Sequence, residues 1–273
     1  MQKAAKIVMR SQKKPKVLIS TCMKDEGPFI LEWVAWHKSI GVSDIVVFTN
    51  DCSDGTVEIL DRLNTMGEVY HLPNPAVLSG STFFQPIALS YTEMLPQFRN
   101  SDYFISIDVD EFINVRTGNG KLDDLFNATG SFDALSISEI NHGSNHQHHF
   151  RRGWITEIFP KHQTETPGKW KAQRGVKSIV CLNDKVKKIR NHRPDIRTDA
   201  EEIIWLDGSG NQLDSLLADA SKNGIDCRGT YNLVALDHYP LRSLDSYLVK
   251  MFRGDVVVKG KRVSERYWRL RNQ

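Results

Sequence analysis

The chain has 273 residues, of which 40% are hydrophobic, 25% charged and 9% aromatic, and its formal net charge is +3. This composition is typical of a globular protein and excludes collagen-like, coiled-coil and wholly disordered classes. The sequence contains no run of about 18 apolar residues and no continuous apolar segment near its start, so we expect neither a membrane span nor a secretory signal. Four cysteines without a C-x-x-C pair indicate reduced thiols in a cytoplasmic protein.

The first 110 residues alternate short apolar runs with segments of helical periodicity. The apolar runs predict strands at Val17–Cys22, Asp44–Thr49, Glu68–Leu72 and Tyr103–Ile107. Helices are predicted from Pro28 to Gly41, after the loop Asn50–Thr56, and over Gln85–Phe98 with an interruption at Pro96, while Pro73–Thr82 is predicted to be a loop. The alternation predicts an α/β fold with a mainly parallel sheet and helices on both faces.

The second half is less regular. It predicts strands at Phe132–Ser138, Val176–Cys181 and Asn232–Leu236, and loops at Asn141–His149 and His162–Gly168. An amphipathic helix is predicted around Leu244–Phe252. Because the sequence shows neither an internal repeat nor a low-complexity linker, we expect one continuous domain with an elaborated C-terminal half.

Basic residues cluster before Asp25, between Lys169 and Arg193, and between Lys250 and Arg271. Such clusters are either solvated faces or surfaces for a phosphate-bearing ligand or an anionic membrane. Nucleic acid is not an expected partner, because no recognition motif accompanies the charge and the sequence pI is only 8.6. The basic tail and the C-terminal helix suggest peripheral contact with the inner face of a membrane.

Three polar loops, Met23–Gly27, Asn50–Thr56 and Asp108–Glu111, follow predicted strands. Ligands of parallel α/β sheets bind beyond the carboxyl ends of the strands, so we expect these loops to converge on one site. Asp108 and Asp110 offer the hard oxygen ligands that suit Mg²⁺ or Mn²⁺ on a diphosphate. Two reactions use such a pair: phosphate transfer to an aspartate, as in haloacid dehalogenase-type phosphatases, and sugar transfer from a nucleotide donor.

The loop NDCSDGT (Asn50 to Thr56) resembles the D-D-x-S-x-D-G-T loop of glycosyltransferase family 2, and it favours sugar transfer. The opening VLISTCMKDEGPFILEWVAWHKSIGVSDIVVFTNDCSDGT resembles GT-A-fold glycosyltransferases related to families 2 and 92. DVDEF (Asp108 to Phe112) and HYPLRSLDSYLVKMFRG (His238 to Gly254) resemble the same group. Lys177-Ser178 and His192-x-Pro194 also fall where the group tends to have K-S and H-x-P, so the resemblance covers most of the chain in order.

The resemblance implies a GT-A, Rossmann-like fold in which residues 1–115 form a nucleotide-binding half. Residues 116–273 would form the acceptor-binding half and a C-terminal lid. It implies a Mn²⁺- or Mg²⁺-dependent glycosyltransferase (hexosyltransferase type) that moves a sugar from a nucleotide-sugar, a UDP-sugar, to a saccharide or lipid-linked acceptor with inversion, in polysaccharide biosynthesis. A catalytically silent nucleotide- or carbohydrate-binding relative is the alternative from another class.

The same resemblance assigns roles to individual residues. It implies that the metal is held by Asp108, Asp110 and His238, with Asp108 acting through water or on the ribose. The nucleotide donor would be bound by Glu26, Asp51, Asp108, Arg242 and Lys250, with Arg253 also facing the diphosphate. Glu139 is the candidate catalytic base and Asp195 its rival. The competing interpretations are helix caps for Glu26 and Asp51, a packed imidazole for His238, and solvated faces for the basic residues.

Two further groups of residues attract structural interpretations. The histidines at 142, 146, 148 and 149 match no zinc spacing, so we expect an acceptor-facing loop instead of a zinc site. Trp33 and Trp36 are expected to be core anchors. The sequence departs from the family pattern at Asp25, at Asn50 and over Ile140–His149, which leaves the nucleotide and the acceptor open.

Overall fold

The computed structural model describes residues 14–165, 175–197, 199, 202–213, 229–254, 257 and 264–272. Parts of the predicted basic clusters, the end of the predicted loop His162–Gly168 and one cysteine lie outside these residues: Lys3, Lys6, Arg10, Lys13, Gly168, Lys169, Lys171, Arg174, Cys227, Lys259, Lys261 and Arg262.

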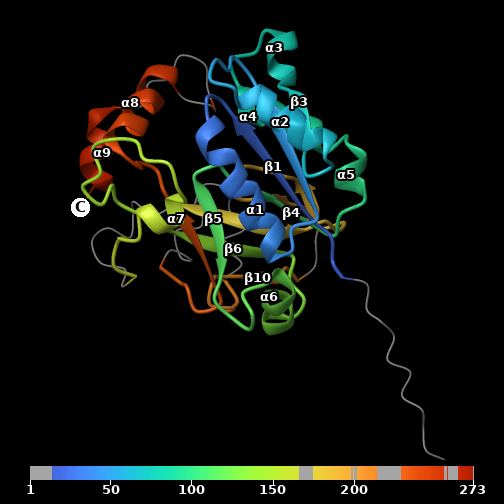
Figure 1. The fold of residues 1–273 in the computed structure, drawn as a ribbon. Coiled ribbons are helices and arrows are strands. Elements are labelled where there is room, and N and C mark those ends of the chain that lie inside the picture. Colours follow the sequence, from blue (N-terminus) through green and yellow to red (C-terminus); the bar gives the residue numbers. More distant parts are fainter. Residues whose placement is uncertain are drawn as a thin grey trace, which may run out of the picture.

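One large, mostly parallel sheet runs through both halves of the described chain (Figure 1). Its strand order is β3-β2-β1-β4-β7-β6-β11-β5, and β10 pairs with β6. The strands of this sheet are β1 (Val17–Met23), β2 (Asp44–Thr49), β3 (Tyr70–Pro73), β4 (Tyr103–Ser106), β5 (Glu111–Val115), β6 (Ala134–Asn141), β7 (Val176–Cys181), β10 (Trp205–Leu206) and β11 (Val234–His238). A separate two-stranded sheet pairs β8 (Val186–Lys188) with β9 (Asp195–Ile196).

The helices lie on both faces of the sheet, so the predicted fold class is confirmed (Figure 1). They are the 3-10 helix η1 (Gly27–Phe29), α1 (Ile30–Ile40), α2 (Thr56–Thr65), α3 (Pro75–Ser79), α4 (Phe84–Thr92), α5 (Pro96–Arg99), α6 (Leu122–Thr129), α7 (Ile155–Ile158), α8 (Leu244–Arg253) and α9 (Glu265–Arg271). The described helices include none that is long and apolar enough to span a bilayer.

The alternation of side chains along the buried strands divides the core between the two faces. In β1, Ile19 packs in the cluster that contains residues of α1, α2 and α6, while Leu18 packs in the cluster that contains residues of α4. In β2, Val47 and Val46 divide in the same way. These strands are buried on both faces, which is why they are continuous apolar runs in the sequence.

Local signals set the ends of the helices that position the site. The helix α1 ends at Gly41, whose φ of 109° is left-handed and allows its N–H to bond to the carbonyls at the helix end. The helix α8 begins after Ser243, whose hydroxyl accepts a hydrogen bond from the backbone N–H of Ser246. The predicted helix over Gln85–Phe98 is interrupted as expected, because Pro96 starts the separate short helix α5.

Several elements differ from the expectations. The predicted loop Pro73–Thr82 contains α3, in which Asn74 caps the first turn and Pro75 occupies the first helical position. Strand β5 and helices α6 and α9 were not expected from the sequence pattern. β7 runs antiparallel to both its neighbours, β4 and β6, so these two strands run in the same direction and β7 alone is reversed between them.

Candidate active site

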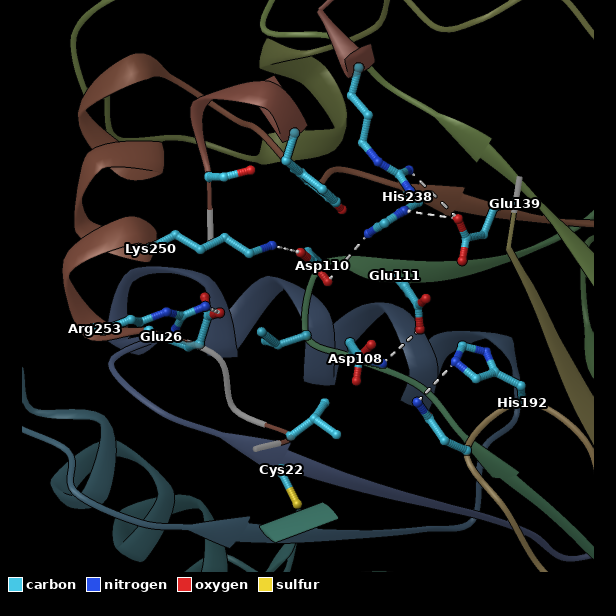
Figure 2. Close-up of a pocket in the computed structure, with 17 residues that line it drawn as sticks. Cys22, Glu26, Asp108, Asp110, Glu111, Glu139, His192, His238, Lys250 and Arg253 are labelled. Carbon is cyan, nitrogen blue, oxygen red and sulfur yellow. Dashed lines mark hydrogen bonds and ion pairs between the residues drawn. The ribbon is translucent and has the colours of Figure 1, made fainter. Parts of the chain in front are cut away.

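A cavity of about 500 Å³ lies beyond the carboxyl ends of the parallel strands (Figure 2). The turn after β4, the ends of β6 and β11, and helices α8 and α9 all contribute to its lining. Its polar lining includes Glu26, Asp108, Asp110, Glu111, Glu139, Asn191, His192, His238, Lys250, Arg253, Tyr267 and Arg271.

The turn Asp108–Glu111 is held in place by hydrogen bonds to a buried side chain of the core. The buried indole of Trp33 donates its N–H to the backbone carbonyls of Asp108, at 3.1 Å, and Glu111, at 2.9 Å. The Glu111 carboxylate in turn accepts the backbone N–H of Asp108 at 2.8 Å. The expectation that Trp33 is a core anchor is confirmed, and Trp36, half-buried beside it, donates to the carbonyl of Ile113.

Asp110 and His238 face one another across the cavity (Figure 2). His238 Nε2 lies 3.8 Å from Asp110 Oδ1, and the Lys250 ammonium donates to Asp110 Oδ2 at 2.6 Å. Burial penalises the Asp110 charge, but Lys250 and His238 outweigh it and hold the pKa of this carboxyl well below its usual value. Asp110 is therefore an ionised carboxylate in a buried position.

The other nitrogen of His238 is held by two groups at the end of β6. Nδ1 lies 3.2 Å from Glu139 Oε2 and 3.0 Å from Asn141 Oδ1. Although burial disfavours its charge, Glu139 and Asp110 raise the pKa of His238 to about 9. Burial also opposes the charge of Glu139, but His238 and Arg271 lower its pKa to about 2. These contacts orient the imidazole so that Nε2 points at Asp110.

Asp108 forms an ion pair with a lysine of β7. Lys177 is fully buried, and its ammonium lies 3.3 Å from Asp108 Oδ2, 3.4 Å from Glu111 Oε2 and 2.6 Å from Asn191 Oδ1. Gln85 of α4 donates to the other Asp108 oxygen at 3.3 Å. Burial, helped by the Asp108 charge, raises the pKa of Glu111 to about 8. The carboxylates thus surround one buried cation.

The C-terminal wall of the cavity is basic. Glu26, which is buried, accepts a hydrogen bond from Arg242 at 2.7 Å and another from Arg253. Arg253 also donates to the carbonyls of Lys24 and Asp25. Burial disfavours the Glu26 charge, yet the two guanidinium groups lower its pKa. This cluster attaches the segment from His238 to Arg253 to the loop that follows β1.

The donor atoms at this position fit a divalent cation. Once its proton has left, His238 Nε2 and Asp110 Oδ1 combine an imidazole nitrogen with a hard carboxylate oxygen, which is a ligand pair suited to Mn²⁺. The second contact of the imidazole, to Glu139 and Asn141, is the supporting bond that metal-binding histidines usually make. Ligand atoms of Glu111, Glu139 and His238 also lie within 4.8 Å of one another. Asp108 differs, because its carboxylate faces Lys177 and Gln85.

Some predicted residues are not brought into this cavity. Asp51 is exposed, and in the described structure it is absent from the cavity lining. Asp195 pairs with Arg190 in the small sheet and is also absent from that lining, so the rival base is not supported. Of the histidine-rich loop, His142 is buried against Tyr239, with ring centroids 4.1 Å apart, whereas His149 is exposed. Neither belongs to the ligand group found among the described residues.

Sequence reasoning missed several residues of the cavity. Asn191 and Gln85 contact the Lys177–Asp108 pair, and Arg271 and Tyr267 enter from α9. The motif Lys177-Ser178 carries no assigned role in the sequence analysis. Its position within a predicted apolar strand is the signal that could have identified Lys177 as part of the site. A lysine in an apolar strand needs a buried carboxylate partner.

Residues 19–215 match the model of glycosyltransferase family 92, which covers more than half of the chain. A glycosyltransferase family 92 protein from Ricinus communis is 27% identical over 128 residues, which are 45% of this chain and 21% of that protein. This chain therefore spans about a fifth of the length of the curated relative that it matches.

Solved structures give weaker likenesses. S. aureus TarS in complex with UDP is 15% identical with a TM-score of 0.35, over 61% of this chain and 46% of that chain. The mannosyltransferase PcManGT from Pyrobaculum calidifontis, in complex with GDP-Man and Mn²⁺, is 15% identical with a TM-score of 0.33, over 46% and 36% of the two chains. Family membership rests on the match over residues 19–215.

Proposed function

The chain belongs to glycosyltransferase family 92, and from that membership we propose that it transfers a sugar from a nucleotide-sugar, a UDP-sugar, to a hydroxyl of a saccharide or lipid-linked acceptor with inversion. The single observation that supports this reaction most is the pair Asp110 and His238, 3.8 Å apart, in a cavity whose other wall carries Lys250 and Arg253. A divalent cation and a diphosphate are the ligands that this charge pattern suits.

The basic wall is proposed to bind the diphosphate of the donor. Lys250 and Arg253 both line the cavity, and ammonium and guanidinium groups form strong charge-assisted bonds with phosphate oxygens. Glu26 was expected to contact the nucleoside, but its carboxylate already accepts from Arg242 and Arg253. We therefore assign Glu26 and Arg242 to anchoring Arg253. Asp51 as the partner of the uracil remains a prediction.

Asp110 and His238 are proposed to hold Mn²⁺ or Mg²⁺, with Asp108 acting through water or on the ribose. When bound, the cation would neutralise the charge that develops on the departing nucleoside diphosphate. Lys250, which pairs with Asp110 at 2.6 Å and lines the same cavity, would share that task. Fixed positive charge at the leaving group lowers the barrier because it is already oriented before the reaction.

The transfer step is a single displacement. The acceptor hydroxyl oxygen forms a bond to the anomeric carbon as the bond between that carbon and the diphosphate oxygen breaks. The electron pair leaves with the nucleoside diphosphate, and the hydroxyl proton passes to a carboxylate of the cavity. The displacement inverts the configuration at the anomeric carbon.

Glu139 was the candidate for that carboxylate, and its contacts favour a different role. A carboxylate with a pKa of about 2 that is bound to His238 and Arg271 is a weak base. We propose that Glu139 positions His238. Glu139→Gln should then weaken Mn²⁺ binding measured by calorimetry as well as lower kcat. Loss of kcat with unchanged Mn²⁺ affinity would instead restore Glu139 as the base.

The most informative experiment is a thermal-shift panel of nucleoside diphosphates with and without Mn²⁺. We expect UDP to stabilise the wild-type chain only when Mn²⁺ is present, and UDP-sugar to be turned over or hydrolysed under the same conditions. NMR of the product formed with an acceptor should show the opposite anomeric configuration. Stabilisation by UDP that is independent of metal would reject the proposed role of Asp110 and His238.

Two alternatives are separated by the same assays. A silent binding relative would bind UDP with Mn²⁺ and turn over no donor, whereas the ionised Asp110 beside His238 favours an active enzyme. A phosphatase would form an aspartyl phosphate at Asp108, which beryllofluoride should trap. The family match favours sugar transfer over this second alternative.

A further inference from the structure

The outward surface of α8 carries apolar side chains that nothing in the described structure covers. Leu248, Val249 and Phe252 have exposed fractions of 42%, 54% and 90%. Leu248 and Val249 precede Phe252 by four and three residues, so both lie on the same side of the helix as Phe252. A single exposed leucine is ordinary, but a phenylalanine that is nine-tenths exposed beside two further apolar residues forms a patch.

A second exposed segment adjoins this patch. All residues from His148 to Trp154 except the glycine carry exposed side chains, and Trp154 is 51% exposed. The segment is bonded to the start of α8, because the Asp245 N–H donates to the His148 carbonyl and its carboxylate accepts the Phe150 N–H at 2.9 Å. In Figure 1 the chain that leads into α7 passes beside α8 and α9.

The charge of the segment is positive. Arg151 and Arg152 are exposed, and neither has an ion pair with another residue that the structure describes. Residues 148–154 include no acidic side chain. Aromatic rings flanking arginines suit the boundary between lipid tails and head groups, where rings insert and guanidinium groups meet phosphates.

We propose that the outer side of α8 and the segment 148–154 together bind the surface of a bilayer that contains anionic lipids. As an addition that rests on the proposed function, we infer that the acceptor is lipid-linked. Both elements belong to the expected acceptor-binding half of the chain.

The placement of α8 connects this surface to the cavity. The same helix that turns Phe252 outward turns Lys250 and Arg253 toward the site, and an α-helix is only about 10 Å across. A second cavity of about 250 Å³ lies between Phe29, Phe150 and Val249. It shares Lys250 and Arg253 with the main cavity, so it lies between the proposed membrane surface and the donor site.

Co-sedimentation of the full chain with vesicles tests the proposal. Wild type should bind vesicles of phosphatidylglycerol and phosphatidylcholine and bind pure phosphatidylcholine much more weakly. The double variant Phe252→Ser/Trp154→Ser should lose roughly 10- to 100-fold of this binding, because two apolar side chains no longer insert. Arg151→Gln/Arg152→Gln should lose roughly fivefold per arginine on the anionic vesicles alone.

Met66→Ser is the matched control, because Met66 is 59% exposed at the end of α2 that leads to the start of β3, away from the carboxyl edge of the sheet. It should bind vesicles like wild type. The proposal is overturned if wild type binds no anionic vesicles or if both double variants bind as wild type does, as they would if the basic tail alone made the contact. It is also overturned if the variants instead dissociate a dimer in solution.

Failure of this proposal is distinguishable from failure of the proposed function. None of the substituted residues lines the main cavity in the described structure, so each variant should keep the thermal shift with UDP and Mn²⁺. Vesicle binding without that shift would leave the surface intact and reject the donor site. The acceptor inference is rejected if a water-soluble saccharide is glycosylated equally fast with and without vesicles.

Discussion

The two aspartates of the cavity are held by lysines that belong to different walls. Asp108 is paired with Lys177, which is fully buried on β7, while Asp110 is paired with Lys250, which lies on α8 and is 21% exposed. The sheet wall is set by the packing of β7 between β4 and β6. The helical wall is bonded to the loops at the edge of the sheet through the ion pairs of Lys250 with Asp110 and of Arg253 with Glu26. We infer that the lysine on the sheet mainly stabilises the site, whereas the lysine on the helix is able to exchange its carboxylate partner for a ligand.

The largest effect is expected where both walls meet, at Asp110. Asp110→Asn removes the charge that faces His238 and Lys250, and turnover should fall by about 10³-fold or more because transition-state charge stabilisation is lost. The melting temperature should change by only a few degrees, since the Lys250 ammonium still reaches water. Asp123→Asn, on an exposed pair with Lys14, is the matched control and should keep its activity. Retained turnover in Asp110→Asn would remove the metal role.

Breaking the sheet wall should reduce stability. Lys177→Met leaves Asp108 and Glu111 without their buried cation, and removal of one partner from a buried pair lowers the free energy of unfolding by about 3–5 kcal/mol. Denaturant unfolding measures this loss. Lys185→Met, whose partner Asp133 it reaches from a half-buried position, should lose much less. An unfolding free energy of Lys177→Met close to that of wild type would contradict the assignment of Lys177 to the rigid wall.

Breaking the helical wall should reduce ligand binding instead. Lys250→Met should weaken binding of UDP with Mn²⁺ by roughly 10- to 100-fold, which is the worth of one charge-assisted bond. Binding of Mn²⁺ alone should be equal or tighter, because the ammonium no longer competes for Asp110. Calorimetry measures both. Lys38→Met, which removes a lysine of α1 that donates to the backbone carbonyl of Ser43, serves as the control. Weaker binding of Mn²⁺ alone to the variant would contradict the inference that Lys250 exchanges Asp110 for a ligand.

The smallest expected effect is on the pH dependence of thermal stability, to which the charge of His238 contributes. The pKa of His238 is raised to about 9 in the folded chain from an ordinary value near 6.5, so its charge stabilises the metal-free protein below pH 6.5. That stabilisation is lost as the pH rises toward 9. The difference in melting temperature between wild type and His238→Asn should therefore shrink between pH 6.5 and 9. A constant difference would contradict the raised pKa of His238 in the folded chain.

Mn²⁺ should act in the opposite direction over the same range. The ion competes with the proton for His238 Nε2, so the thermal shift that Mn²⁺ gives the wild type should grow from pH 6.5 to pH 9.

The sheet of the N-terminal half was predictable because its strands are buried on both faces. Val17–Cys22 and Asp44–Thr49 are apolar runs with no competing pattern, and the structure places them as β1 and β2. β5 was not predicted because it starts inside the acidic motif, at Glu111. The antiparallel direction of β7 was not predictable either, since it depends on pairing with residues 38 to 78 positions away in the chain.

The site residues that lie within recognisable sequence motifs were predictable. Asp110 and His238 are brought together as expected, although 128 residues separate them. Roles that depend on what a side chain already contacts were not predictable. Nothing in the sequence shows that Glu139 is bound to His238, or that Glu26 is shared by two arginines.

The two arginines on Glu26 have a consequence for how the protein is made. They lie 216 and 227 residues further along the chain. A ribosome adds about 5–20 residues per second, so Glu26 waits roughly 10–45 s for these partners to be synthesised. The strands of the first half are complete long before then. A nascent chain therefore has these strands early and gains the basic wall of the cavity only after Arg253 has been synthesised.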